Sequence, residues 1–173
     1  MATFVLGLAA AFGRDLISQS RQDRRELTAR QHETEKAARE RREAFELEHL
    51  VEFNSLLRAS VESFFDFEAA MRPYRAAQAA GQPLTEVGGA AASAGSSFQA
   101  SHAALAAQIG FIVSDEVREK AKAAASDLNE AYDHELFADH DSPTSSLSRE
   151  ALDAAYEVLS ARVREIYAGR DQG

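Results

Sequence analysis

The feature that most constrains this chain is a long stretch without helix-breaking residues. Residues 15–72 contain neither proline nor glycine, and most of them are strong helix formers. Since globular helices usually run roughly 8 to 20 residues, the stretch predicts a helix far longer than one compact domain needs. No alternating run of β-branched residues follows it. We therefore expect an all-α protein with a long N-terminal stalk helix leading into a small antiparallel helical bundle.

The long stretch changes character near residue 45. Residues 18–44 are polar on almost every face, which is typical of a helix that bridges regions or pairs only weakly. Their thin apolar seam is too poor in Leu and Ile to commit the segment to a coiled coil. From 45 to 71, apolar residues recur at steps of three and four, which predicts an amphipathic core helix. Its expected core stripe is Phe45, Leu50, Phe53, Leu57, Val61, Phe64 and Met71.

The remaining chain predicts three shorter helices that complete a bundle over residues 45–169. Pro73 should end the long helix, and the Ala- and Gly-rich residues 73–97 read as a flexible connector. A short buried helix should then begin near Phe98. Ser114 is a good N-cap for the next helix, and Ser146 or Ser148 for the last. The expected inner faces are Val117, Ala121, Ala124, Leu128, Ala131 and Leu136, then Leu152, Ala155, Leu159, Val163 and Ile166, with Gly169 at the end.

The first 17 residues form an apolar N-terminal segment. Residues 2–13 are uncharged, but a helix needs roughly 20 apolar residues to cross a bilayer. The segment therefore predicts shallow membrane contact, or burial in the protein's own core or a homo-oligomer interface. A cleaved signal is a third reading, although no basic residue precedes the run. The expected membrane or oligomer contacts are Phe4, Val5, Leu6, Leu8, Phe12, Leu16 and Ile17.

Charge and composition exclude several function classes. The chain has 28 acidic and 19 basic residues, for a formal net charge of −9. Residues 14–43 carry a small basic excess, and the rest of the chain is strongly acidic, which disfavours nucleic-acid binding by the bundle. Because there is no cysteine, disulfides, thiolate metal sites and cysteine nucleophiles are excluded.

The densest group of possible metal ligands lies at 133–135 and 139–141. It comprises Asp133, His134 and Glu135, then Asp139, His140 and Asp141. These residues do not share a helix face at ligand spacing, so we expect no tight metal site. No nucleophile motif or phosphate-binding loop occurs either. We therefore expect no catalytic residues, no cofactor and no identifiable small-molecule substrate.

Two parts of the sequence carry a resemblance. They are Arg41-Arg42-Glu43 through Val51-Glu52-Phe53, and Ile109 to Val113 followed by Ser114-Asp115-Glu116-Val117-Arg118. In this layout the chain resembles a broad class of small helical proteins of high-GC Gram-positive bacteria. Those proteins begin with an apolar segment, continue into an Arg- and Glu-rich helix and end in a small bundle. The resemblance implies a membrane-proximal helical protein without catalytic residues.

Two functions fit these patterns. The first is a non-enzymatic scaffold or adaptor on the cytoplasmic side of the cell membrane, with the apolar segment docked to lipid. Its bundle would recruit a protein partner. The alternative is a soluble cytoplasmic subunit of a helical assembly, with the apolar segment and stalk buried between copies. Residues 2–17 discriminate between the two.

Overall fold

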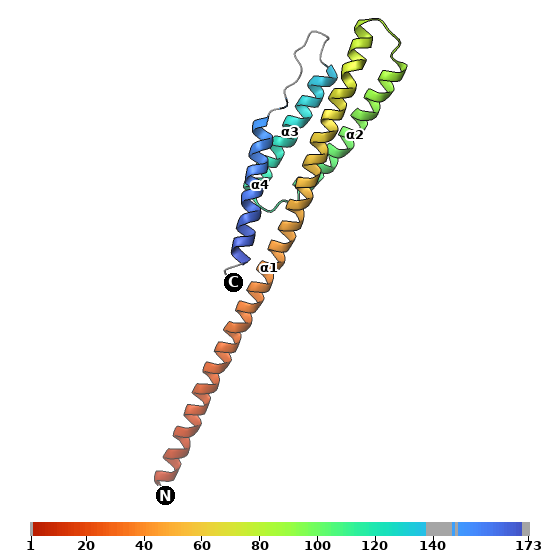
Figure 1. Cartoon of the computed structure of the whole chain (residues 1–173). Coiled ribbons are helices and arrows are strands. Elements are labelled where there is room, and N and C mark those ends of the chain that lie inside the picture. Colours follow the sequence, from red (N-terminus) through yellow and green to blue (C-terminus); the bar gives the residue numbers. More distant parts are fainter. Residues whose placement is uncertain (1, 138–146, 148, 171–173) are drawn as a thin grey trace. The chain divides into compact units, whose positions relative to one another are not determined.

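The structure is a computed structural model that describes the backbone of residues 2–137, 147 and 149–170, and the side chains of residues 22, 24–137, 147 and 149–169. Its helices are α1 (Ala2–Ala79), α2 (Thr85–Ile109), α3 (Asp115–Phe137) and α4 (Arg149–Arg170), shown in Figure 1. No strand occurs among these residues, so the expected all-α class is confirmed. The chain divides into two compact units, Met1–Ala44 and Phe45–Gly173.

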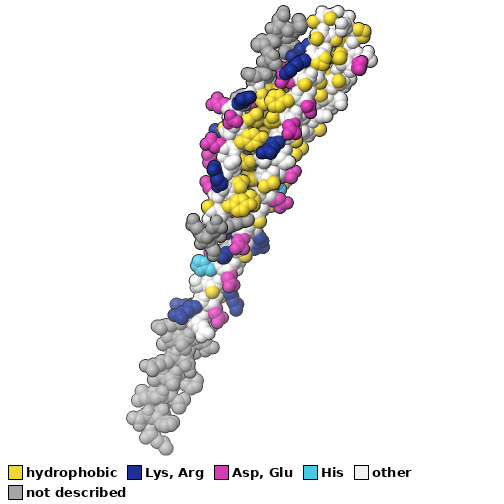
Figure 2. Space-filling model, in the orientation of Figure 1, with side chains coloured by type: hydrophobic (Ala, Val, Ile, Leu, Met, Phe, Trp, Pro, Cys, Tyr) yellow, Lys and Arg dark blue, Asp and Glu magenta, His cyan; other side chains and the backbone are white. Residues whose placement is uncertain are grey.

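The first unit is helical and offers no apolar face in its described part. Every side chain from residue 24 to residue 42 is exposed, Leu27 among them. Figure 2 shows mainly charged and polar side chains there. A helix of this kind is stabilised by its own backbone hydrogen bonds and by neighbouring charges, not by burial. This agrees with the sequence prediction of a segment polar on almost every face.

The second unit is an antiparallel bundle built from the later half of α1 together with α2, α3 and α4 (Figure 1). Short connections join α1 to α2 and α2 to α3, which favours antiparallel neighbours. On the visible face of the bundle, hydrophobic side chains are interspersed with charges of both signs (Figure 2). The interior is apolar, with its largest side chains from α1 and α2 and many alanines from α3.

Aromatic rings form the centre of this interior. Phe98 of α2 stacks on Tyr132 of α3 with ring centroids 4.6 Å apart, and meets Phe64 of α1 edge-on at 6.0 Å. Phe67 of α1 lies 4.6 Å from Tyr132. Offset and edge-to-face pairs of this kind add stabilisation beyond the area they bury. One aromatic cluster therefore holds three helices together.

The predicted stripe of the central helix is confirmed except at its first residue. Leu50, Phe53, Leu57, Phe64 and Met71 are buried and Val61 is partly buried, whereas Phe45 is 46 % exposed. Phe67, which is not part of this stripe, is also buried. The stripe therefore begins one turn later than expected.

The prediction that Pro73 ends the long helix is wrong. Helix α1 continues to Ala79 with Pro73 inside it. A proline inside a helix costs about 3 kcal/mol, but burial of Met71 and Ala77 on either side of it offsets this cost.

The actual end of α1 is a glycine cap. Gly81 has a φ of +62°, the amide of Gln82 donates to the carbonyl of Ala77 at 2.9 Å, and the amide of Gly81 donates to the carbonyl of Gln78 at 3.1 Å. This is a Schellman motif.

The predicted connector at 73–97 is helical over most of its length. Residues 73–79 belong to α1 and residues 85–97 to α2, so the break between helices covers only 80–84. Glycine weakens an isolated helix, but α2 is held by tertiary packing. A Cβ on Gly95 would lie 3.2 Å from the Tyr132 hydroxyl and 3.4 Å from the Phe67 ring. The glycine is thus required for close packing against the aromatic cluster.

Helix α3 starts where the sequence places it but presents a different inner face at its end. Ser114 precedes the helix and its hydroxyl faces the Val117 amide at 3.5 Å. Leu136, expected inside, is 42 % exposed, while Glu135 is buried.

Helix α4 buries Leu152, Ala155, Leu159 and Ile166, with Val163 partly buried, as predicted. Gly169 lies inside α4, and Ser146 and Ser148 lie outside the described residues.

Candidate functional site

Three aromatic rings lie together on the surface of the second unit. The His49 ring meets Phe45 edge-on at 4.2 Å and stacks on Phe111 at 5.0 Å. Phe45 and His49 are one turn apart on α1, and Phe111 lies in the connection between α2 and α3. The two phenylalanines are 46 % and 53 % exposed. We call these three residues the aromatic surface, because they offer apolar rings to solvent instead of to the core.

A buried glutamine fixes the orientation of the His49 ring. Gln108 is 9 % exposed, and its Nε2 donates to His49 Nδ1 at 2.8 Å and to the His49 carbonyl at 3.2 Å. An Nδ1 that accepts a hydrogen bond carries no proton, so the neutral ring is protonated on Nε2. The ring is therefore held in one tautomer and one orientation between the two phenylalanines.

Acidic side chains flank the aromatic surface. Glu48 and Glu52 are exposed and follow Phe45 at three and seven residues, which places them on the same side of α1. Aromatic faces attract Arg and Lys, and nearby carboxylates strengthen that preference. The arrangement can therefore bind a partner that combines apolar and basic side chains.

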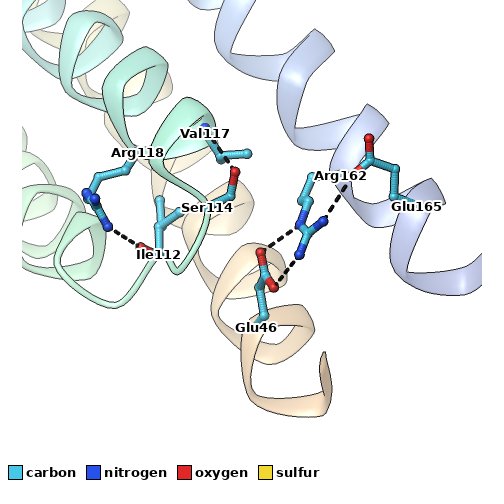
Figure 3. A network of polar contacts seen from close by, with 7 residues as sticks. All are labelled: Glu46, Ile112, Ser114, Val117, Arg118, Arg162 and Glu165. Atoms are coloured by element: carbon cyan, nitrogen blue, oxygen red, sulfur yellow. Dashed lines mark hydrogen bonds and ion pairs between the residues drawn. The ribbon is translucent and has the colours of Figure 1, made fainter. Parts of the chain in front are cut away.

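A buried ion pair lies one residue from Phe45. Glu46 is 2 % exposed and accepts two hydrogen bonds from Arg162 of α4, from Nε and from Nη2, each at 2.8 Å (Figure 3). Arg162 also donates to Glu165 at 3.0 Å. Hydrogen bonding to the Glu46 carboxylate is the main cause that raises the pKa of Arg162 above its usual value. This bidentate pair ties α4 to α1 beside the aromatic surface.

A second interhelix ion pair connects the end of α1 to the end of α3. Arg75 Nη2 lies 2.6 Å from Glu135 Oε2 and also donates to the Glu135 carbonyl. Glu135 is 1 % exposed. Because its carboxylate faces inward, Leu136 is turned toward solvent. The two ion pairs therefore hold the helices in register at different levels of the bundle.

The predicted N-terminal contact residues are helical, but their side chains lie outside the described residues. These are Phe4, Val5, Leu6, Leu8, Phe12, Leu16 and Ile17, all within α1. Across the part of the chain that is described, no helix is both long enough and apolar enough to cross a membrane. The assignment of these residues to a membrane or oligomer contact stays a prediction.

The carboxylate and histidine cluster near residue 134 is only partly described. Asp133 and His134 are exposed on α3, and Glu135 pairs with Arg75. Asp139, His140 and Asp141 lie outside the described residues. Among the residues whose side chains are described, no three histidine or carboxylate groups are placed to hold a metal ion.

One further histidine is partly buried in the core. His102 stacks on Phe98 at 5.5 Å, and burial lowers its pKa below the usual value, so the neutral form is favoured. Next to it in the sequence, Ser101 and Ser63 join α2 to α1 through a hydroxyl–hydroxyl contact of 2.6 Å. These groups pack the bundle together. The contacts of the described residues bring His102 together with neither a nucleophile nor a second titratable group.

Sequence reasoning missed the aromatic surface and both ion pairs. The periodicity places Phe45 in the core stripe, and His49 and Gln108 have no recognisable spacing. The available signal was the Phe45-x-x-x-His49 step on one helix face, but its third member is far along the chain. Comparisons with known protein families, with curated proteins and with solved structures found no match.

Proposed function

We propose that the protein is a non-enzymatic helical scaffold or adaptor that docks to the cytoplasmic face of a membrane and recruits a protein partner. The observation that carries the proposal is the continuity of α1. Its first residues are the apolar segment, and its later half supplies Phe53, Phe64 and Phe67 to the bundle core. An apolar segment joined by unbroken helical backbone to a packed domain is a suitable anchor. The aromatic surface is then available for the partner.

Charge supports the same arrangement. Arg21, Arg24, Arg25 and Arg30 follow the apolar segment. Basic residues are retained on the cytoplasmic side, so the bundle should face the cytoplasm. Each basic residue near an anionic surface contributes about 1 kcal/mol, partly cancelled here by Asp15, Asp23 and Glu26. Binding should therefore depend on both the apolar residues and anionic lipid.

The proposal predicts a lipid interaction that two leucines control. The full-length protein should float with phosphatidylglycerol vesicles, bind weakly to phosphatidylcholine vesicles and dissociate as salt is raised. Replacing Leu6 and Leu8 with Asp should lower the bound fraction by more than about tenfold, because two apolar side chains leave the lipid. Vesicle flotation measures this. A chain beginning at Ser18 should behave like the double variant.

Leu27→Asp is the matched control, because Leu27 is exposed on the polar part of α1. It should float like the wild type. Equal flotation of the wild type and the Leu6→Asp, Leu8→Asp variant, or no flotation of either, would contradict the membrane proposal.

The alternative function is a soluble subunit of a helical assembly, formed by copies of the chain. One described feature favours it, which is that two exposed phenylalanines, Phe45 and Phe111, both contact the His49 ring. Clustered exposed aromatic residues are typical of protein–protein contacts. In this function the aromatic surface and the apolar segment would be buried between copies.

Sedimentation velocity over a range of concentrations distinguishes the two functions. If the chain self-associates through the aromatic surface, Phe45→Ala with Phe111→Ala should raise the dissociation constant by more than about tenfold, since each ring is a central contact. Phe65→Ala is the control. Phe65 is exposed to nearly the same extent as Phe111, but it lies on α1 outside the aromatic surface. A monomer at every concentration, or an equal effect of the control, would rule out assembly through this surface.

A further inference from the structure

A buried amide keeps the rings of the aromatic surface ordered. Gln108, which is only 9 % exposed, donates hydrogen bonds both to the ring and to the backbone carbonyl of His49. The His49 ring in turn stacks on Phe111 with an interplanar angle of 16° and meets Phe45 edge-on. Side chains that are already ordered lose little conformational entropy when a partner binds. The three rings therefore form a preorganised surface for a ligand.

The two phenylalanines of this surface can attract a cation. Phe45 is 46 % exposed and Phe111 is 53 % exposed, although both contact the His49 ring. The face of an aromatic ring attracts Arg and Lys side chains. A guanidinium is planar and weakly hydrated, so it can lie flat on a ring and still donate hydrogen bonds to a carboxylate. The rings therefore suit arginine better than lysine.

The charges of the second unit favour the same ligand. Glu48 and Glu52 are exposed on α1 beside the aromatic surface. The basic residue nearest in sequence to the connection between α2 and α3 is Arg118, and its guanidinium already donates to the Ile112 carbonyl and to Asp115. Carboxylates beside an aromatic ring can accept charge-assisted hydrogen bonds from a guanidinium that lies on that ring. The surface therefore combines aromatic faces with carboxylate acceptors.

Basic residues of α1 restrict the direction from which a cation approaches. Arg41 and Arg42 precede Phe45 by one turn of the helix. The Nε of Arg41 donates to the Ala37 carbonyl at 3.1 Å, which lies still further toward the N-terminus. A cation is repelled on that side of Phe45. The favourable side is the one that carries the two glutamates.

We infer that the aromatic surface binds an arginine side chain of the protein partner. The guanidinium stacks on a phenylalanine ring and donates hydrogen bonds to Glu48 or Glu52, and apolar neighbours of the arginine cover the rest of the rings. This inference rests on the proposed function and specifies its partner as a segment that carries arginine beside apolar residues.

A fluorescent peptide tests the surface directly. The probe is a labelled alanine-based peptide that carries arginine and leucine at helical spacing. Its titration into the full-length protein, followed by fluorescence anisotropy, should give a dissociation constant on the order of 100 μM. The same peptide with lysine in place of arginine should bind at least about threefold more weakly. A version with glutamine should not bind measurably.

Two pairs of substitutions locate the bound arginine. Phe45→Ala with Phe111→Ala should weaken binding of the arginine peptide at least about tenfold. Glu48→Gln with Glu52→Gln should weaken it about threefold to tenfold, because the guanidinium loses its charged acceptors. All four side chains are exposed, so both variants should fold, and circular dichroism melting checks this. If the first variant melts early, the second still tests the surface.

Another exposed phenylalanine on α1 provides the matched controls. Phe65 is 52 % exposed, and the exposed acids Glu62 and Asp66 flank it. Phe65→Ala removes one exposed ring, and Glu62→Gln with Asp66→Asn removes the same charge as the glutamate variant. Both controls should bind the arginine peptide like the wild type, because neither changes the aromatic surface.

Four results would overturn the inference. No binding would show that the surface takes no arginine, and equal binding of the arginine and lysine peptides would show a general attraction to an acidic protein. Equal losses in the control variants would place the peptide elsewhere. Self-association that Phe45→Ala with Phe111→Ala abolishes would mean that a second copy occupies the surface. Vesicle flotation depends on residues 2–17, so a failure of membrane docking is distinguishable from all four.

Discussion

Replacing Phe64 with alanine should lower the free energy of unfolding by about 3 to 5 kcal/mol. Phe64 is 1 % exposed and meets Phe98 of α2 edge-on at 6.0 Å, so its removal leaves a cavity and ends an aromatic contact between two helices. Phe53→Ala should have an effect of similar size, because Phe53 has no exposed surface. Urea unfolding followed by circular dichroism at 25 °C measures both changes.

The neighbouring residue provides the control for this prediction. Phe65 differs from Phe64 by one position and is 52 % exposed. Phe65→Ala should cost less than about 1 kcal/mol, since little apolar area returns to water. The assignment of the core would be wrong if Phe53→Ala and Phe64→Ala both left the unfolding midpoint unchanged.

The central helix was predictable because its pattern is local. Leu50, Phe53, Leu57 and Phe64 recur at three- and four-residue steps, and a helix places such residues on one face whatever it packs against. Phe45 continues the same pattern but is exposed, whereas the next residue, Glu46, is buried against Arg162 of α4. Local periodicity identifies a face and does not say how much of it is covered.

The end of the long helix and the start of α2 were not predictable from local preference. Pro73 and the glycines of 81–95 are unfavourable in an isolated helix. Contacts between residues far apart in the sequence keep these segments helical, including the close packing of Gly95 against Tyr132 and Phe67. The pair Gly81 and Pro83 was the better signal for a helix end, because the glycine sits at the left-handed cap position and the proline follows it.

The aromatic surface illustrates a different limit of sequence reasoning. An exposed phenylalanine and a core phenylalanine have the same side chain, so composition cannot separate Phe45 and Phe111 from Phe53 and Phe98. The decisive facts are that Phe111 lies in a connection between helices and that Gln108 turns the His49 ring toward it. Both depend on how α2 packs against α1.

Breaking the ion pair between Glu46 and Arg162 should also lower the stability of the protein strongly. Arg162→Ala should lower the free energy of unfolding by about 2 to 3 kcal/mol, because it leaves a carboxylate in the core without its two hydrogen bonds. The value lies below that for a fully buried pair, since the Arg162 side chain is 33 % exposed. Urea unfolding measures it. Lys122→Ala, which breaks the pair with Glu119 on the surface of α3, should cost less than about 0.5 kcal/mol.

A double variant separates the cost of an unpaired charge from the value of the pair. Glu46→Leu with Arg162→Leu removes both charges and keeps apolar volume between α1 and α4. It should recover most of the stability lost in Arg162→Ala, because replacing a buried pair with apolar residues is often nearly neutral. If the double variant were as unstable as the single one, the pair itself would be stabilising the bundle. If Arg162→Ala matched Lys122→Ala, the Glu46 carboxylate would have to be solvated, contrary to its 2 % exposure.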